Sequence, residues 1–101
     1  MIFKEHKKYD PTWLVEAAMQ VKDEYPWLPE SLKNCVSIIK ETKYYIYFIN
    51  PKRPNKPGAE WQFTDNIFLE NTKYGDVVLD VLKDNRIGGV ELYSKLMKES
   101  T

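Results

Sequence analysis

The sequence contains very few side chains that could act as a nucleophile or a general base. It has one histidine, His6, and one cysteine, Cys35. His6 lies in a charged N-terminal stretch, where no pattern holds its imidazole within hydrogen-bonding distance of a target. Cys35 opens an apolar run and lacks the helix N-terminus or cationic neighbour that would lower the pKa of its thiol. We therefore expect an exposed His6, a Cys35 that belongs to the core, and a protein that is not an enzyme.

Residues that could bind a metal ion or a phosphate are also few. One histidine and one cysteine cannot supply the ligands of a zinc site. The spacing Asp76-x-x-x-Asp80, together with Glu91, offers oxygen ligands to a hard cation, but acidic side chains on an exposed strand are the simpler interpretation. Gly88 and Gly89 lie inside an apolar strand pattern, which indicates a bulge or a close backbone approach and not a phosphate loop. We expect no metal ion, no cofactor and no small-molecule ligand.

A basic loop and the strand before it form one candidate binding surface. The basic loop, residues 51–58, contains no acidic side chain. Its basic residues are Lys52, Arg53 and Lys56. The preceding strand carries Tyr45 and Tyr47, and a stacking surface beside positive charge is typical of proteins that bind single-stranded nucleic acids. The competing interpretation is that the tyrosines pack under a helix and that the loop is simply solvated.

An acidic stretch with aromatic residues forms a second candidate surface. Between residues 60 and 80, five acidic residues stand against one lysine, which leaves a local net charge of −4 in a protein of near-zero total charge. Negative charge interleaved with large aromatic side chains suits a docking face for a basic protein surface. The residues that we expect to contact such a partner are Glu60, Trp61, Glu70, Asp76, Asp80, Glu91 and Tyr93.

The elements that position these residues begin with an N-terminal helix. Asp10 has the character of an N-cap and Pro11 that of a first helical residue. Since Pro26 and Pro29 break the pattern, the sequence predicts a helix over residues 11–24, with one further short turn starting at Pro29. The apolar side chains at helical spacing should face a sheet, and they are those of Trp13, Leu14, Ala17, Ala18 and Val21.

Patterns of period two follow the helix. Residues 35–39 and 44–49 are rich in β-branched and aromatic side chains and lie close together in the chain, which predicts an antiparallel hairpin. The basic loop cannot be strand or helix because it contains three prolines. Residues 59–63 and 67–70 are shorter strand candidates, joined through a turn at residues 64–66.

The last hairpin has the clearest strand signal. Asp84 and Asn85 tolerate the positive φ angles of a two-residue turn. The resulting pairs are Leu82 with Ile87, Leu79 with Val90, Val77 with Leu92, Asp80 with Gly89 and Asp76 with Tyr93. One face is then apolar, with Val77, Leu79, Val81, Val90 and Leu92, and the other is largely acidic, with Asp76, Val78, Asp80, Glu91 and Tyr93. Residues 94–100 can add a final helical turn or two.

Length and composition place these elements in one α+β domain. A chain of 101 residues supports one core, and 14% aromatic residues are too many for a disordered segment. The 15 basic and 15 acidic residues balance, so total charge does not direct the chain to nucleic acid or to a membrane surface. A single cysteine and the lack of an apolar run of ~18 residues predict a cytoplasmic protein. We expect residues 1–101 to form a single domain, with the N-terminal helix packed on an antiparallel sheet of about five strands, a meander of hairpins.

Several blocks of the sequence resemble a known group of proteins. They lie within residues 45–91, about half of the chain, and are residues 45–51, 59–63, 66–70 and 84–91 together with the basic loop. In these blocks the chain resembles the small cytosolic immunity proteins that neutralise bacterial contact-dependent growth inhibition toxins and related polymorphic toxins. The last hairpin is also similar to the end of a small prokaryotic domain family, a likeness that implies fold more than function.

The first resemblance implies a stoichiometric inhibitor that binds one cognate toxin domain, often a nuclease, and covers its active site. No residue role is carried over, because fold and contact residues differ between types of immunity protein. A target other than a nuclease, or binding away from the active site, stays open, since the total charge is neutral. The alternative function is a single-stranded nucleic-acid or regulatory binding module.

Overall fold

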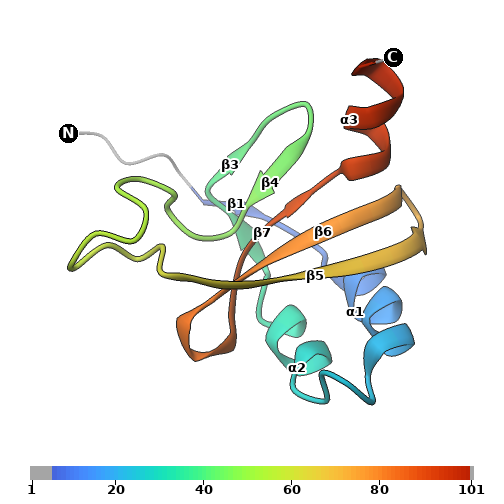
Figure 1. The fold of residues 1–101 in the computed structure, drawn as a ribbon, viewed down its shortest axis with the longest axis horizontal. Helices are drawn as coiled ribbons and strands as arrows, with labels where there is room; N and C mark the ends of the chain where they lie inside the picture. Colours follow the sequence, from blue (N-terminus) through green and yellow to red (C-terminus); the bar gives the residue numbers. More distant parts are fainter. Residues whose placement is uncertain (1–5, 101) are drawn as a thin grey trace.

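A five-stranded antiparallel sheet organises the fold (Figure 1). The computed structural model describes residues 6–100, and the strand order of this sheet is β3-β4-β7-β6-β5. Its strands are β3 (Lys40–Glu41), β4 (Tyr45–Tyr47), β5 (Phe63–Thr72), β6 (Gly75–Leu82) and β7 (Arg86–Glu91). Two short strands, β1 (Lys7–Lys8) and β2 (Ser37–Ile38), form a second sheet. The predicted α+β class with an antiparallel sheet of five strands is confirmed.

The N-terminal helix is shorter than predicted and ends in a tighter turn. α1 covers Thr12–Ala18 and continues as a single 3-10 turn, η1 (Met19–Val21). Pro11 precedes the first helical turn, and the carboxylate of Asp10 accepts a hydrogen bond of 3.0 Å from the Thr12 N–H. Of the residues expected to face the sheet, Trp13, Leu14 and Ala18 are buried, and Ala17 and Val21 are half-buried.

A second helix follows where one short turn was predicted. α2 covers Leu28–Lys33, with Pro29 in its first turn. α1 packs on β5 and on α2, and α2 packs on β7, so both helices cover the same side of the sheet, called the inner face below (Figure 1). The buried strand residues under these helices are Ile46, Ile67, Leu69, Val77, Leu79, Val81, Ile87 and Val90.

The predicted hairpin of residues 35–39 with residues 44–49 is only partly present, because β4 pairs with Lys40–Glu41, which lie beyond the predicted first strand. β2 pairs with β1, whereas β3 pairs with β4. The Ile39 N–H, between β2 and β3, donates to the Tyr47 carbonyl at 2.9 Å. The pairing with β1 was not predicted, since Lys7 and Lys8 lie in a charged stretch without an apolar pattern.

One strand, β5 (Phe63–Thr72), is present where two shorter strands were predicted. β5 runs through the segment 64–66, and residues 59–62 form no strand. The predicted turn is wrong: Thr64, Asp65 and Asn66 lie within β5 beside a register irregularity between Phe63 and Asp65. The Thr64 hydroxyl donates to the Val81 carbonyl at 3.0 Å. Pairing along the length of β6 therefore outweighs the local turn preference of Asp and Asn.

The last hairpin has the predicted turn residues in a longer turn. Asp84 and Asn85 adopt positive φ angles of 64° and 59°. The turn consists of three residues, η2 (Lys83–Asn85), and Leu82 faces Arg86 across it. The expectation of a two-residue turn was therefore wrong by one residue.

A bulge in β7 explains this difference. The predicted pairs Leu79 with Val90 and Asp80 with Gly89 are present. Between this pair and the turn the ladder shifts by one residue, so that Val81 faces Ile87 and Gly88 is the extra residue of a bulge. The predicted pairing of Leu82 with Ile87 is wrong for this reason. The ladder ends at the pair Val78 with Glu91, so it does not include the two outermost predicted pairs, Val77 with Leu92 and Asp76 with Tyr93. The apolar and the acidic face separate as predicted: the first is buried except for half-buried Leu92, and all of the second is half-buried.

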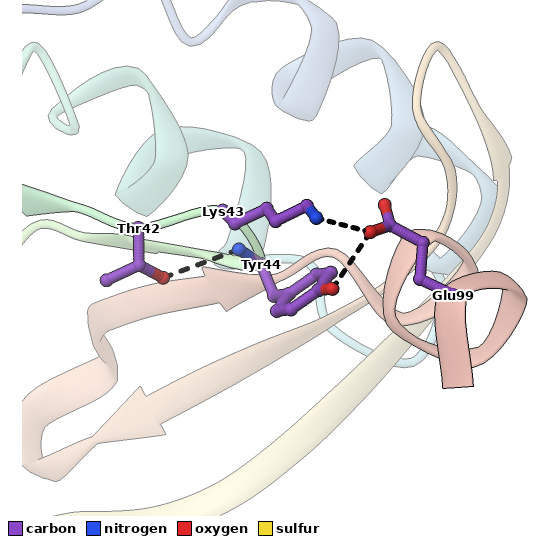
Figure 2. A network of polar contacts seen from close by, with 4 residues as sticks. All are labelled: Thr42, Lys43, Tyr44 and Glu99. Atoms are coloured by element: carbon purple, nitrogen blue, oxygen red, sulfur yellow. Dashed lines mark hydrogen bonds and ion pairs between the residues drawn. The ribbon is translucent and has the colours of Figure 1, made fainter.

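The C-terminal helix α3 (Tyr93–Ser100) follows β7 and packs on β6. A polar clasp joins it to the turn between β3 and β4 (Figure 2). The Nζ of Lys43 lies 2.6 Å from the Oε1 of Glu99, and the Tyr44 hydroxyl donates to the same oxygen at 3.0 Å. These hydrogen bonds lower the pKa of Glu99. Over residues 6–100, no helix has the length and apolar character needed to cross a membrane.

Candidate binding face of the sheet

The two helices α1 and α2 leave the opposite face of the sheet uncovered. Strand alternation places two rows of cross-strand neighbours on this side. The first row is Tyr45, Glu91, Val78 and Phe68, and the second is Tyr47, Gly89, Asp80 and Asn66. We call these residues the outer face. In the row between them, the inner-face residues Ile46, Val90, Leu79 and Ile67 are buried, which confirms that the two rows point the other way.

A polar network centred on Asp80 crosses the outer face. One carboxylate oxygen of Asp80 accepts a hydrogen bond from the Tyr45 hydroxyl, and the other accepts one of 2.6 Å from the Asn66 side chain. Burial, and then the hydrogen bond and negative charge of Asp80, raise the pKa of Tyr45, so its hydroxyl stays a donor at neutral pH. Asp80 was predicted as a contact for a partner, but both of its oxygens already have partners within the sheet.

Gly89 makes this network possible. A Cβ atom at Gly89 would collide with the Ile46 carbonyl oxygen and with the Tyr45 ring. The Tyr45 ring can therefore lie across β7 and reach Asp80 on β6. The Tyr47 ring packs on it, with the two centroids 4.1 Å apart. The close backbone approach predicted from the Gly88-Gly89 pair is confirmed.

Trp61 lies at one end of the tyrosine pair. Its side chain is 8% exposed, and its ring centroid is 6.1 Å from that of Tyr47. A Cβ atom at Gly88 would come within 2.7 Å of the Trp61 ring, so the ring rests directly on the bulge. Trp61 supports the face and offers little surface to a partner.

The exposed aromatic residue of the outer face is Phe68, which was not among the predicted contacts. Its side chain is 45% exposed, and its ring meets the half-buried Tyr93 ring edge-on at 5.6 Å. Phe68 alternates with the buried residues Ile67 and Leu69, and this alternation is the sequence signal that could have identified it. A partly exposed aromatic pair of this kind is typical of surfaces that are buried in protein interfaces.

The other predicted acidic residues occupy different positions. Glu91 is half-buried between Tyr45 and Val78 on the outer face. The carboxylate of Asp76 accepts a hydrogen bond of 3.0 Å from the Asn71 N–H and so stabilises the turn between β5 and β6. Glu70 is exposed near that turn, and Glu60 is exposed before the opposite end of β5. The structure thus brings Asp80, Glu91 and Tyr93 together and places Asp76 and Glu70 at the rim, with Glu60 apart.

The basic loop lies beside the Trp61 end of the outer face. The Asn55 N–H donates to the Trp61 carbonyl at 2.8 Å, and the Asn55 side chain accepts from the Phe63 N–H at 2.9 Å. These bonds fasten the loop to the start of β5. Its three basic side chains, Lys52, Arg53 and Lys56, are exposed. The basic loop therefore joins the sheet beside Trp61, whose ring is next to that of Tyr47, and the Tyr45 hydroxyl is bonded to Asp80.

Cys35 and His6 lie in different environments. Cys35 is 7% exposed and lines a pocket of about 350 Å³ beside the turn at Asp84. Burial raises the pKa of its thiol to about 12, so the sulfur stays protonated at neutral pH. His6 is exposed and lies 3.4 Å from the Ser37 hydroxyl. In the described part of the chain, no three His, Cys, Asp or Glu residues are grouped so that they could hold a metal ion.

Comparisons with known proteins give no relative for this chain. No protein-family model matches it, and neither a curated protein nor a solved structure matches it. The candidate site therefore rests on its own geometry, and the likeness to immunity proteins remains an expectation from the sequence.

Proposed function

We propose that the protein is a binding domain that docks one partner protein on the outer face. The supporting observation is the exposed Phe68 ring, next to Tyr93 and in the same cross-strand row as Glu91, on a face that α1 and α2 leave open. A specific interface hides about 800 Å² on each partner, which is roughly one-eighth of the 6794 Å² of accessible surface. One sheet face is large enough for this purpose.

The biological role that we propose is neutralisation of a bacterial toxin domain in the cytoplasm. The support is that segments of the sequence resemblance, residues 45–51, 66–70 and 84–91, contribute β4, part of β5 and β7, which build the outer face. Glu91 on this face, with Asp76 and Glu70 at its rim, would complement a basic surface such as the substrate groove of a nuclease.

The test uses the toxin domain that is encoded directly upstream of this gene, because an immunity gene is expected directly downstream of its toxin. Titration calorimetry should show one binding site, and Phe68→Ala and Glu91→Lys should each weaken the affinity by roughly tenfold or more. The matched controls are Val36→Ala and Glu30→Lys, which alter an exposed apolar and an exposed acidic residue outside the outer face. Growth protection should follow the affinity.

Two results would count against the proposal. Absence of binding to the upstream toxin domain removes the toxin-neutralising role. Full affinity of folded Phe68→Ala and Glu91→Lys variants removes the outer face as the docking site.

A second function, binding of single-stranded nucleic acid, is favoured by one observation. The exposed Lys52, Arg53 and Lys56 lie in a loop that is hydrogen-bonded to Trp61, next to the stacked rings of Tyr45 and Tyr47. On this proposal, single-stranded DNA binds with a steep salt dependence, and neutralising all three basic residues lowers the slope by up to about three units. No binding at low salt would remove this alternative.

A further inference from the structure

Strand β5 forms a long open edge of the sheet. It has ten residues and pairs only with β6, whereas the opposite edge strand, β3, has two residues (Figure 1). An edge strand presents peptide N–H and C=O groups that another extended chain can pair with. The two edges of this sheet therefore differ greatly in what they offer to a second chain.

The outward-pointing peptide groups of β5 belong to alternate residues. The Gln20 side chain donates to the Glu70 carbonyl at 3.0 Å and accepts from the Glu70 N–H at 2.8 Å, so Glu70 points away from β6. Phe68 and Asn66 point the same way, because alternate residues of an antiparallel strand face the same neighbour. The Asn66 N–H is bonded to the side chain of Asp65 at 2.8 Å.

The contact with Gln20 shows which groups can bond to the free edge of β5. At Glu70 the amide of Gln20 supplies one donor and one acceptor, as a peptide group of a neighbouring strand would. Phe68 lies between the two residues whose N–H groups are already bonded, and its own outward peptide groups have no partner among residues 6–100. The open position is therefore at the same residue whose ring is exposed on the outer face.

Charge decides which kind of chain can pair there. The segment Phe63–Thr72 contains Asp65 and Glu70 and no lysine or arginine. A second copy of β5 would bring the same negative charge alongside, and like charges on neighbouring strands are destabilising. A segment with basic side chains at alternate positions has the complementary charge.

We infer that an extended basic segment of the partner protein adds to the sheet as a strand beside β5, centred on Phe68. This inference rests on the proposed function and specifies how the partner is held. The added strand bonds the peptide groups of Phe68, and one of its side chains packs on the Phe68 ring. Its basic side chains lie beside Glu70 and the acidic rim.

The test uses two synthetic eight-residue peptides that alternate lysine and valine. The first has normal amides, and the second carries a methyl group on every backbone nitrogen, which keeps the charge and the side chains but removes every N–H donor. The normal peptide should bind the full-length protein and slow hydrogen exchange of the Phe68 amide by roughly tenfold or more, as measured by NMR. The methylated peptide should bind roughly tenfold more weakly.

The results that would overturn strand addition differ from those that would overturn docking on the outer face. Equal binding of the two peptides, or binding without protection of the Phe68 amide, overturns strand addition, as does a β5-mediated dimer of the protein in sedimentation experiments. Such results leave docking on the outer face intact if Phe68→Ala and Glu91→Lys still weaken toxin binding. Protection of the Phe68 amide by the normal peptide, together with full toxin affinity of both variants, retains the strand site and removes the proposed outer-face docking.

Discussion

The two faces of the main sheet are built by different means. The part of the inner face that α1 and α2 cover is apolar, and no polar residue is buried within the described part of the chain. The outer face is held by a hydrogen-bonded network and by tyrosine rings that lie over a glycine. Burial of apolar surface on the inner face supplies most of the stability. Residues of the outer face divide into those that maintain its shape, such as Asp80, and those that remain available, such as Phe68.

The largest effect is expected from truncating a side chain of the inner face. Leu79 is 0% exposed, and Leu79→Ala should lower the free energy of unfolding by about 2–5 kcal/mol, because the cavity cannot fully close. Phe68→Ala on the outer face is the matched control and should lower it by less than about 1 kcal/mol. Urea denaturation followed by tryptophan fluorescence measures both. Equal losses would mean that the outer face contributes as much packing as the inner face.

The next effect tests the space that Gly89 provides. Gly89→Ala should cost about 1–3 kcal/mol, because the new methyl group collides with the Ile46 carbonyl and displaces the Tyr45 ring. The control is Gly58→Ala in the basic loop, where a Cβ atom meets nothing within 4 Å and only the positive φ of 81° is unfavourable. Thermal unfolding and near-ultraviolet circular dichroism report stability and ring packing. If Gly89→Ala retains the tyrosine signal, the rings do not depend on this glycine.

A smaller effect is expected from neutralising Asp80. Asp80→Asn weakens the hydrogen bonds to Tyr45 and Asn66 and should cost about 1–2 kcal/mol. The pKa of Tyr45 in the folded protein is raised above its ordinary value of 10.0, partly by Asp80. Tyr45 therefore contributes stability that is present below pH 10 and is lost as the pH rises. Asp80→Asn should lower the pKa of Tyr45 in an NMR titration, with Tyr45→Phe as the assignment control, and an unchanged pKa would contradict this coupling.

The smallest effect concerns the clasp that fastens α3, the helix that begins with Tyr93. The pKa of Glu99 is lowered by its bonds to Lys43 and Tyr44. A lowered pKa means stability that is present above pH 4.5 and is lost as the pH falls through the folded value. Glu99→Gln should therefore be less stable than wild type at neutral pH but not in acid, in thermal unfolding scans. Glu16→Gln, which alters an exposed acidic residue of α1, is the control variant.

Sequence reasoning succeeded where several local signals agree. The last hairpin combines period-two apolar spacing with Asp84 and Asn85, which adopt the positive φ angles that a tight turn requires. The double glycine predicted a bulge or a close backbone approach, and the structure has both, a bulge at Gly88 and a close approach at Gly89. In β5 the local signals misled, because Thr64, Asp65 and Asn66 have turn character but are held in the ladder by pairing with β6.

The candidate site was predicted only in part, because its contacts join distant positions of the chain. Asp80 was recognised as acidic and on the right face, but its hydrogen bonds reach Tyr45 and Asn66, which are 35 and 14 positions away. Such partners depend on strand order, and the order β4-β7-β6-β5 is not encoded in any local pattern. Phe68 was missed although it lies in the predicted strand 67–70, because its neighbours Ile67 and Leu69 are also apolar and hydropathy alone does not show which side chain faces outward.

The position of β4 in the sheet has a consequence for how the chain folds. β5, β6 and β7 are consecutive hairpins, whereas β4 pairs with β7 across a long separation, with Tyr45 opposite Glu91. Contacts between near residues form faster than contacts that must close a long loop. We therefore expect the β5–β7 meander to form first and β4 to dock later. In that interval the edge of β7 is bare, because the outward peptide groups of Gly88 and Leu92 have not yet bonded to Phe48 and Tyr44. An incompletely folded chain is therefore most open to unwanted pairing with other chains on either side of Gly89, the residue over which the Tyr45 ring later lies.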